Sequence, residues 1–167
     1  MSTILQLRHA LIVRPVPTAV AGIALRTFRG QQDVDPWLEL RHRAFAREAV
    51  SVRRWSAADF ESEFLLKRWW QPDRLWFAET VAGLVRSPQI VGTVALAMRD
   101  AGESPKPVVH WLAVLPNWRR RGVGRLLLSA LEAACWDDGF REVYLETHAR
   151  WTAAGRFYKA LGYESAS

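Results

Sequence analysis

Residues 114–125 read Val-Leu-Pro-Asn-Trp-Arg-Arg-Arg-Gly-Val-Gly-Arg, and the apolar run Leu126-Leu127-Leu128 follows directly. An apolar strand that ends at Val114 therefore leads through a short Pro/Asn turn into a Gly-x-Gly pair that opens a helix. The glycines let the backbone approach a ligand closely, and the first N–H groups of a helix have no partner within it. Four arginines within residues 119–125 add positive charge at the same place. The segment predicts a site for a phosphorylated ligand such as a diphosphate.

The apolar pattern on either side of this segment predicts alternating strands and helices. Strands are expected at 23–29, 75–81, 89–99, 108–115 and 142–147, and helices at 37–45, 56–70, 122–137 and 152–161. Asp33 offers an N-cap to the first helix, and Ser56 with Asp59 offers a capping box to the second. Residues 108–147 form a strand–helix–strand unit, whose two strands should be parallel. The fold class is α/β, with a mixed sheet and helices on both faces.

Length and charge limit the classes of protein to consider. The chain of 167 residues is 50% hydrophobic and 24% charged, which is typical of a soluble globular protein with one core. Its formal net charge of +6 comes from twenty arginines and three lysines against 17 acids. Acids are interspersed along most of the chain, and the dense unpaired cluster lies at 119–125. The charge thus favours a local phosphate site over a nucleic-acid track.

The single cysteine and the N-terminal segment indicate the compartment. Cys135 excludes an internal disulfide framework, and its place in a helical stretch predicts a buried, unreactive thiol. Residues 3–24 are apolar, but Arg8, Arg14 and Pro15 interrupt them. No run reaches the roughly 18 residues that a membrane span needs. We therefore expect a cytoplasmic protein with no signal peptide, no membrane helix and no metal site.

Two dinucleotide or nucleotide motifs can be tested against the glycine turn. The Rossmann fingerprint needs a third glycine three residues after Gly124, but Leu127 stands there. The P-loop needs Gly-Lys followed by Ser or Thr, and the sequence contains no such triplet. Both motifs are excluded.

The remaining pattern is Arg119-x-x-Gly122-x-Gly124 after an apolar strand, followed downstream by Ala154-Gly-Arg-Phe-Tyr-Lys-Ala-Leu-Gly-Tyr163. With these two motifs in this order, the sequence resembles the GCN5-related N-acetyltransferase (GNAT) superfamily over about residues 22–163. The resemblance implies a mixed, mostly antiparallel central sheet with a strand–helix–strand acyl-CoA site. It divides the chain into an N-terminal extension, 1–21, and an N-acetyltransferase domain, 22–167.

The resemblance also implies how acetyl-CoA, the acyl donor, would be held. In the family, backbone groups at the end of the fourth strand pair with the pantetheine arm, and the N–H groups of the glycine turn bind the pyrophosphate. Backbone donors matter more than the arginine side chains, for which a solvated surface is the alternative. The residues implied in cofactor binding are Leu112, Ala113, Val114, Arg119, Arg120, Arg121, Gly122, Val123, Gly124 and Arg125.

The same resemblance gives candidates for proton transfer. Tyr158 matches the family's general acid, which lies near the thioester sulfur; the alternative is a packed aromatic residue, with Phe157 the more core-facing of the two. Glu146 precedes Tyr158 by twelve residues, as in the branch that acetylates protein N-termini, where a Glu accepts the amine proton.

Several alternatives for the base stay open. Glu146 lies between Leu145 and Thr147, a setting in which a cleft could raise its pKa, although a structural salt bridge is the alternative reading. His110 and His148 are the other candidates for the base. His110 lies on an apolar strand, where a histidine more often belongs to the core.

Two departures from the family pattern affect these expectations. Many relatives carry Asn seven residues before the tyrosine, and Trp151 stands there, which weakens the assignment to peptide N-termini. The family normally adds one or two strands after its Leu-Gly-Phe/Tyr, whereas four residues follow Tyr163. We expect the strand-like segment 3–14 to cover the resulting open edge, in its own or in a partner subunit, since a bare edge favours association.

The sequence thus predicts an acetyl-CoA-dependent N-acetyltransferase that acts by direct transfer in a ternary complex. The acceptor is a primary amine, with a small molecule preferred over a peptide N-terminus. The alternative is a non-catalytic acyl-CoA-binding sensor or scaffold. Trp55, Trp69 and Trp70 flank the second helix, which in the family borders the acceptor. Neither nucleic acid nor membrane is expected as a partner, and a homodimer stays open.

Overall fold

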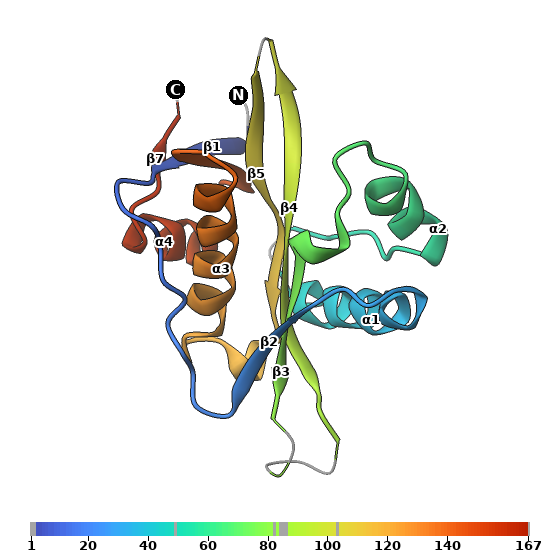
Figure 1. Ribbon diagram of the computed structural model, residues 1–167. Coiled ribbons are helices and arrows are strands. Elements are labelled where there is room, and N and C mark those ends of the chain that lie inside the picture. The colour runs from blue at the N-terminus through green and yellow to red at the C-terminus, as the bar shows by residue number, and fades with distance from the viewer. Residues whose placement is uncertain (1–2, 49, 82, 84–86, 103, 167) are drawn as a thin grey trace.

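The computed structural model describes residues 3–48, 50–81, 83, 87–102 and 104–166. Within them, a seven-stranded sheet has the strand order β2-β3-β4-β5-β6-β1-β7 (Figure 1). The strands are β1 (Ile4–Ala10), β2 (Ile23–Thr27), β3 (Leu75–Thr80), β4 (Ile90–Ala101), β5 (Ser104–Val114), β6 (Glu142–His148) and β7 (Glu164–Ser165). The helices are α1 (Val34–Phe45), α2 (Ala57–Phe60), α3 (Val123–Asp137) and α4 (Thr152–Ala160).

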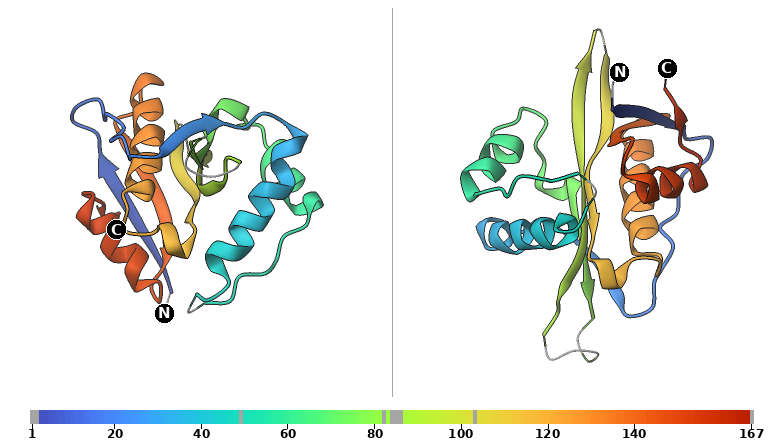
Figure 2. Two further views of the ribbon diagram at one scale, coloured as in Figure 1. Left: turned by 90° about the horizontal axis from the view of Figure 1, so that it is seen from below. Right: turned by 180° about the vertical axis from the view of Figure 1, so that it is seen from behind.

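Helices cover both faces of the sheet, as the sequence predicts. Helices α1 and α2 lie on one face, and α3 and α4 lie on the other (Figures 1 and 2). Neighbouring strands are antiparallel except β5 and β6, which are parallel and are connected through α3. In the described part of the chain, no helix is both long and apolar enough to cross a bilayer.

The edge of β6 is covered by the N-terminal strand of the same chain. Ile4 to Ala10 pair with His148 to Glu142 along the whole of β6. The two-residue strand β7 then pairs with β1 at Leu7 and Arg8. An N-terminal strand therefore completes the sheet on the side where the C-terminal segment contributes only two residues.

Two apolar clusters hold the helices to the sheet. Under α3 and α4, side chains such as Leu127 and Leu131 pack with Leu145 of β6. On the other face, Trp37 of α1 is completely buried in an aromatic cluster, and its Nε1 donates to Thr93 Oγ1 at 3.2 Å. A buried indole N–H needs such a partner, so this bond fixes how α1 lies on the sheet.

The second predicted helix is shorter and less regular than expected. The capping box of Ser56 and Asp59 is present, but α2 ends at Phe60 and a π-helical turn covers Glu61–Leu65. Leu66 N–H donates to Glu61 O, five residues earlier, at 2.9 Å. The wider turn brings Phe64 into the aromatic cluster, and the expected continuation to Trp70 was wrong.

The predicted side-chain cap at Asp33 was also wrong. Asp33 occupies the N-cap position of α1 but makes no capping bond. Its carboxylate accepts two bonds from Arg26, at 2.8 and 2.9 Å, and one from the Arg29 N–H at 2.7 Å. Arg26 is partly buried and also pairs with Glu79, so Asp33 neutralises a partly buried cation in preference to capping the helix.

Strand β5 begins four residues before the predicted start at Val108. Pro105 and Pro107 extend it opposite Asp100 and Met98 of β4. Proline has no N–H to donate to a neighbouring strand. Both prolines precede Val108, the residue at which β5 pairs with β6 in the described structure. The prolines therefore do not break the strand, contrary to the expected boundary.

Gly162 gives a direct test of how the C-terminal segment is joined to β1. Its φ is +92°, and a Cβ placed there would lie 2.8 Å from the His9 ring. We expect Gly162→Ala to lower the free energy of unfolding by about 1–3 kcal/mol through strain and displacement of His9. Gly155 of α4 is the matched control, because a Cβ there meets nothing within 4 Å.

Gly155→Ala should be neutral or stabilising by up to about 1 kcal/mol. Urea unfolding of both variants measures the difference. Equal stability of the two alanine variants would contradict the proposed contact.

Candidate active site

The centre of the candidate site is a β-bulge in β5. Ala95 pairs with His110 and Thr93 with Ala113, so Trp111 and Leu112 together face Val94. Trp111 has a φ of 50°, unusual for a residue with a side chain. A bulge of this kind bends its strand and increases the local twist. It therefore turns the end of β5 away from the line of its neighbour.

Beyond the bulge, β5 and β6 separate. Within the described residues, their ladder has one recorded pair, Val108 with Tyr144. Leu115 N–H donates to Val91 O of β4, so by the alternation of an antiparallel ladder Ala113 also faces β4. Leu112 and Val114 then direct their backbone groups toward β6, and the Val114 C=O accepts from Arg119 Nε at 3.1 Å. An extended ligand can pair with this edge as an added strand would.

The glycine turn leads from β5 into α3 with its N–H groups free. Arg120 and Gly122 have positive φ angles of 60° and 86°. The first hydrogen bond of the helix runs from Leu126 N–H to Gly122 O at 2.9 Å. The backbone N–H groups of 120–125 have no acceptor in the part of the chain that the structure describes. Consecutive free N–H groups at a helix start form a concave site for an anion.

The four arginines of the turn do not act as a group. Arg119 donates to Val114 O at 3.1 Å and Ala44 O at 2.6 Å, and it pairs with Glu48 at 3.2 Å. Its guanidinium thus joins the turn to the end of α1.

Other members of the cluster remain available to a ligand. Arg121 lies over the Trp118 ring at 4.8 Å, and with Arg125 it lines a hollow of about 530 Å³ beside residues 18–21. These two side chains, unlike Arg119, line an open hollow.

Tyr158 is buried on α4, against the expectation that Phe157 would be the more core-facing residue. Phe157 is half-buried and packs against Gly124, where a Cβ would lie 3.2 Å from its ring. Burial of Tyr158 raises the pKa of its hydroxyl well above the usual range, so the phenol keeps its proton at neutral pH.

Glu146 lies on the opposite face of the sheet from Tyr158. Its neighbours Leu145 and Thr147 are buried on the α3 and α4 side, and side chains alternate along a strand. The carboxylate is exposed and accepts from Arg99 Nη1 at 2.8 Å and Gln6 Nε2 at 3.3 Å. The expected apolar surroundings are absent. A base at Glu146 and an acid at Tyr158 could act together only across the gap between β5 and β6.

The two histidine candidates differ in their surroundings. His110 packs against the rings of Phe64, Trp69 and Trp111. Burial, with repulsion from cations such as Lys67, lowers the pKa of its imidazole to about 4. His148 accepts from the Arg150 N–H through Nδ1 at 3.1 Å. His110 is thus a neutral, packed ring at pH 7, as expected of a core histidine.

Trp151 connects the start of α4 to the end of α1. Its ring stacks on Phe45 at 5.7 Å and lies 6.1 Å from the His148 ring. Its Nε1 is buried and has no acceptor among the described residues. The residue that departs from the family pattern therefore places a buried donor between the end of α1 and the end of β6.

Sequence reasoning missed Arg41. This residue of α1 is almost fully buried, with its guanidinium over the rings of Trp55 and Trp111 at 4.2 and 4.3 Å. A signal was present, because Arg41 follows Trp37 by four residues and so lies on the buried stripe of the helix. A charged residue on such a stripe indicates a special environment.

Cys135 takes no part in the site. It is completely buried in α3, and burial together with nearby Asp138 raises the pKa of its thiol to about 12. The predicted buried, unreactive thiol is confirmed.

Comparisons with known proteins agree with this geometry. The model of the Acetyltransferase (GNAT) family matches residues 37–163, and the chain belongs to this family. The mycothiol acetyltransferase of Thermobispora bispora is 31% identical over 152 residues, which cover 89% of this chain and 49% of that protein.

Solved structures share the fold. A GCN5-related N-acetyltransferase from Sphaerobacter thermophilus matches with a TM-score of 0.76 and 27% identity over 97% of this chain and 48% of that one. An aminoglycoside N-acetyltransferase in complex with CoA matches with a TM-score of 0.63 and 21% identity over 91% of this chain and 93% of that one. The chain spans about half the length of the curated relatives that it matches.

His110 gives a pH dependence whose sign is fixed by its lowered pKa. The unfolded state binds a proton near the ordinary pKa of 6.5, while the folded state resists it until about 4. Stability from this group is present above the unfolded value and is lost as the pH falls. We expect a loss of about 2 kcal/mol between about pH 7.5 and pH 5.

Urea unfolding at the two pH values measures this loss. His110→Leu should reduce it by most of that amount, whereas His148→Leu should not. An unchanged pH dependence in His110→Leu would show that the imidazole is not the group responsible.

Proposed function

We propose that this domain is an acetyl-CoA-dependent N-acetyltransferase that transfers an acetyl group directly to a primary amine in a ternary complex. The observation that carries the proposal is the set of free backbone N–H groups at 120–125, which follows the bulged end of β5. The open edge at Leu112 and Val114 suits an amide-containing arm, and the N–H groups of 120–125 suit a diphosphate. Family membership supports this reading.

In this proposal the backbone is the principal ligand of the cofactor. Arg119 is engaged with Val114, Ala44 and Glu48, so its main role is to hold the turn in place. Arg120, Arg121 and Arg125 supply positive charge around the phosphates. The loss of one of their side chains should therefore weaken cofactor binding only modestly.

The chemistry needs two proton transfers. The amine nitrogen forms a bond to the thioester carbonyl carbon, and the carbon–sulfur bond then breaks. Tyr158 holds a phenolic proton that the departing thiolate can take. Glu146 is the proposed acceptor of the amine proton, through water across the gap between the strands.

The preferred acceptor class is a small-molecule amine. Trp151 replaces the Asn found in many relatives, including the peptide-directed branch, and its ring closes onto Phe45. The relatives named for mycothiol and the structural neighbour named for aminoglycosides also point to small molecules. A peptide N-terminus is the alternative acceptor.

Tyr158→Phe tests the acid and the function together. The substitution keeps the packed ring and removes the proton donor, so we expect kcat to fall about a hundredfold or more with acetyl-CoA affinity unchanged. Release of free CoA thiol over a panel of primary amines measures turnover, and calorimetry measures binding. Tight cofactor binding without turnover of any amine by the native protein would favour the non-catalytic sensor or scaffold.

Glu146→Gln, with Arg99→Met as its partner variant, separates a base from a structural salt bridge. If Glu146 accepts the amine proton, Glu146→Gln should lower kcat/KM about a hundredfold, while Arg99→Met keeps the carboxylate and most of the activity. Both variants should lose at most about 1 kcal/mol of stability, because the pair is exposed. Equal and small losses of activity in both would assign Glu146 to the salt bridge alone.

A further inference from the structure

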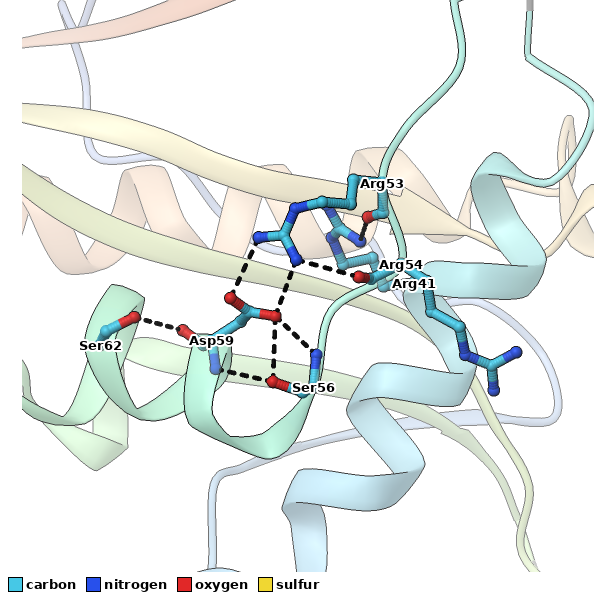
Figure 3. Close-up of polar contacts among 6 residues, drawn as sticks. All are labelled: Arg41, Arg53, Arg54, Ser56, Asp59 and Ser62. Atoms are coloured by element: carbon cyan, nitrogen blue, oxygen red, sulfur yellow. Dashed lines mark hydrogen bonds and ion pairs between the residues drawn. The ribbon is translucent and has the colours of Figure 1, made fainter.

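Arg41 is a buried cation without an anion. The residue is 3% exposed. In the described structure its guanidinium makes one hydrogen bond, from Nη1 to the Arg53 carbonyl oxygen at 2.8 Å. Among the residues that the structure describes, no carboxylate pairs with it. Asp59 is committed to Arg53 through two bonds of 3.0 Å, as Figure 3 shows. A buried charge normally requires a partner of opposite sign.

The two indole rings stabilise the cation only in part. The guanidinium lies over both Trp55 and Trp111, whose rings meet each other edge to face, and such cation–π contacts strengthen when they are shielded from water. The rings supply no hydrogen-bond acceptor for its remaining N–H groups. Arg41 Nε is accordingly buried without a partner in the described structure.

Two further donors belong to the same group of side chains. Trp111 packs against Phe45, which stacks on Trp151, and the Nε1 atoms of both tryptophans are buried without acceptors in the described residues. All the unsatisfied atoms in this group are donors. An oxygen acceptor that reached this group would therefore meet donors alone.

A hollow of about 390 Å³ gives access to Arg41. Its lining includes Arg41, Phe45, Glu48 and Ser51. Glu48 is the acid in the lining, and its charge is balanced by Arg119 at 3.2 Å. The unbalanced charge at the hollow is therefore positive.

We propose that Arg41 binds an oxyanion, a carboxylate or a phosphate, carried by the acceptor amine. The inference rests on the proposed function and narrows its acceptor to an amine that bears a negative group. Trp111 relates this anion site to the reaction site, because its ring covers Arg41 and its backbone leads directly into Leu112. A planar guanidinium with free N–H groups matches the geometry of both oxyanions.

The anion site can be tested without any turnover. Thermal unfolding in increasing acetate, and separately in inorganic phosphate, is measured at constant ionic strength. The native protein should show a saturable rise in Tm, because a ligand of the folded state stabilises it. Arg41→Met should lose the saturable part. Arg54→Met is the matched control, since Arg54 is exposed and points away from Arg41 (Figure 3).

Should Arg41→Met fail to fold, Arg41→Lys provides the second variant. Lysine keeps the positive charge but cannot form bidentate hydrogen bonds to an oxyanion, so half-saturation should need about tenfold more anion. An equal rise of Tm in the native protein, the Arg41 variant and Arg54→Met would overturn the anion site.

Turnover of paired amines tests the link to the acceptor. One pair is phenylalanine and 2-phenylethylamine, and the other is phosphoethanolamine and ethanolamine; each differs by one oxyanion, and the two pairs distinguish carboxylate from phosphate. We expect kcat/KM to favour the anionic member of at least one pair about tenfold or more, and Arg41→Met to remove this preference.

The outcomes separate the inference from the function on which it rests. Turnover without preference for the anionic member in either pair overturns the inference and leaves the acetyltransferase intact. No turnover of any amine counts against the proposed function, and the anion titrations then still decide whether Arg41 binds an oxyanion.

Discussion

The ladder between β1 and β6 is the constraint on which the site depends. β6 has one recorded pair with β5, at Val108 and Tyr144, yet it is bonded to β1 along its whole length. If β6 lacked hydrogen bonds to β5 and had no other neighbour, the backbone groups on both of its edges would be unpaired. β1 satisfies one edge of β6 completely. The other edge of β6 can then do without a full ladder to β5, with which it forms one pair in the described structure.

The segment that follows α4 contacts both α3 and β1, and these contacts fix the position of α4 relative to β1. Tyr163 donates its hydroxyl to Glu132 of α3 at 2.9 Å, in the buried core. Burial raises the pKa of the Glu132 carboxyl, and burial together with Glu132 raises that of Tyr163. His9 of β1 contacts the Tyr163 ring at 5.1 Å, and its Nδ1 lies 3.1 Å from Gly162 O. The end of the Leu-Gly-Tyr motif thus positions α4, which carries Tyr158, against the strand that supports the gap.

The fold could be predicted from the sequence where local signals agree with the tertiary structure. The strand, glycine turn and helix at 108–137 combine apolar periodicity with a turn that only glycine tolerates at Gly122, and this part is confirmed. Local signals failed where a tertiary partner competed for the same group. Asp33 was available as a cap, but the partly buried Arg26 took its carboxylate. The bulge at Trp111 leaves no local signal, because it reflects the register between two strands.

The candidate site shows the same division. The glycine turn and the place of Tyr158 on α4 follow from motifs, whereas the burial of Tyr158 and the partners of each charged side chain depend on the folded chain. Glu146 appeared to lie in an apolar setting because its sequence neighbours are buried, but alternation along β6 places it on the exposed face beside Arg99. Consecutive side chains of a strand point to opposite faces of the sheet. The burial of Leu145 and Thr147 therefore says little about the surroundings of Glu146 between them.

Arginine density was also a poor guide to where a buried charge without an anionic partner would lie. In the conspicuous cluster at 119–125, Arg119 is already paired with Glu48 and bonded to two carbonyl groups. The buried cation that lacks an anionic partner in the described structure is Arg41, which stands on an apolar stripe of α1 with acids nearby in the sequence. Exposed arginines find water and counter-ions at little cost, so their number carries little information. A single arginine at a buried position must be compensated by specific groups, and its position on the stripe makes it the more informative residue.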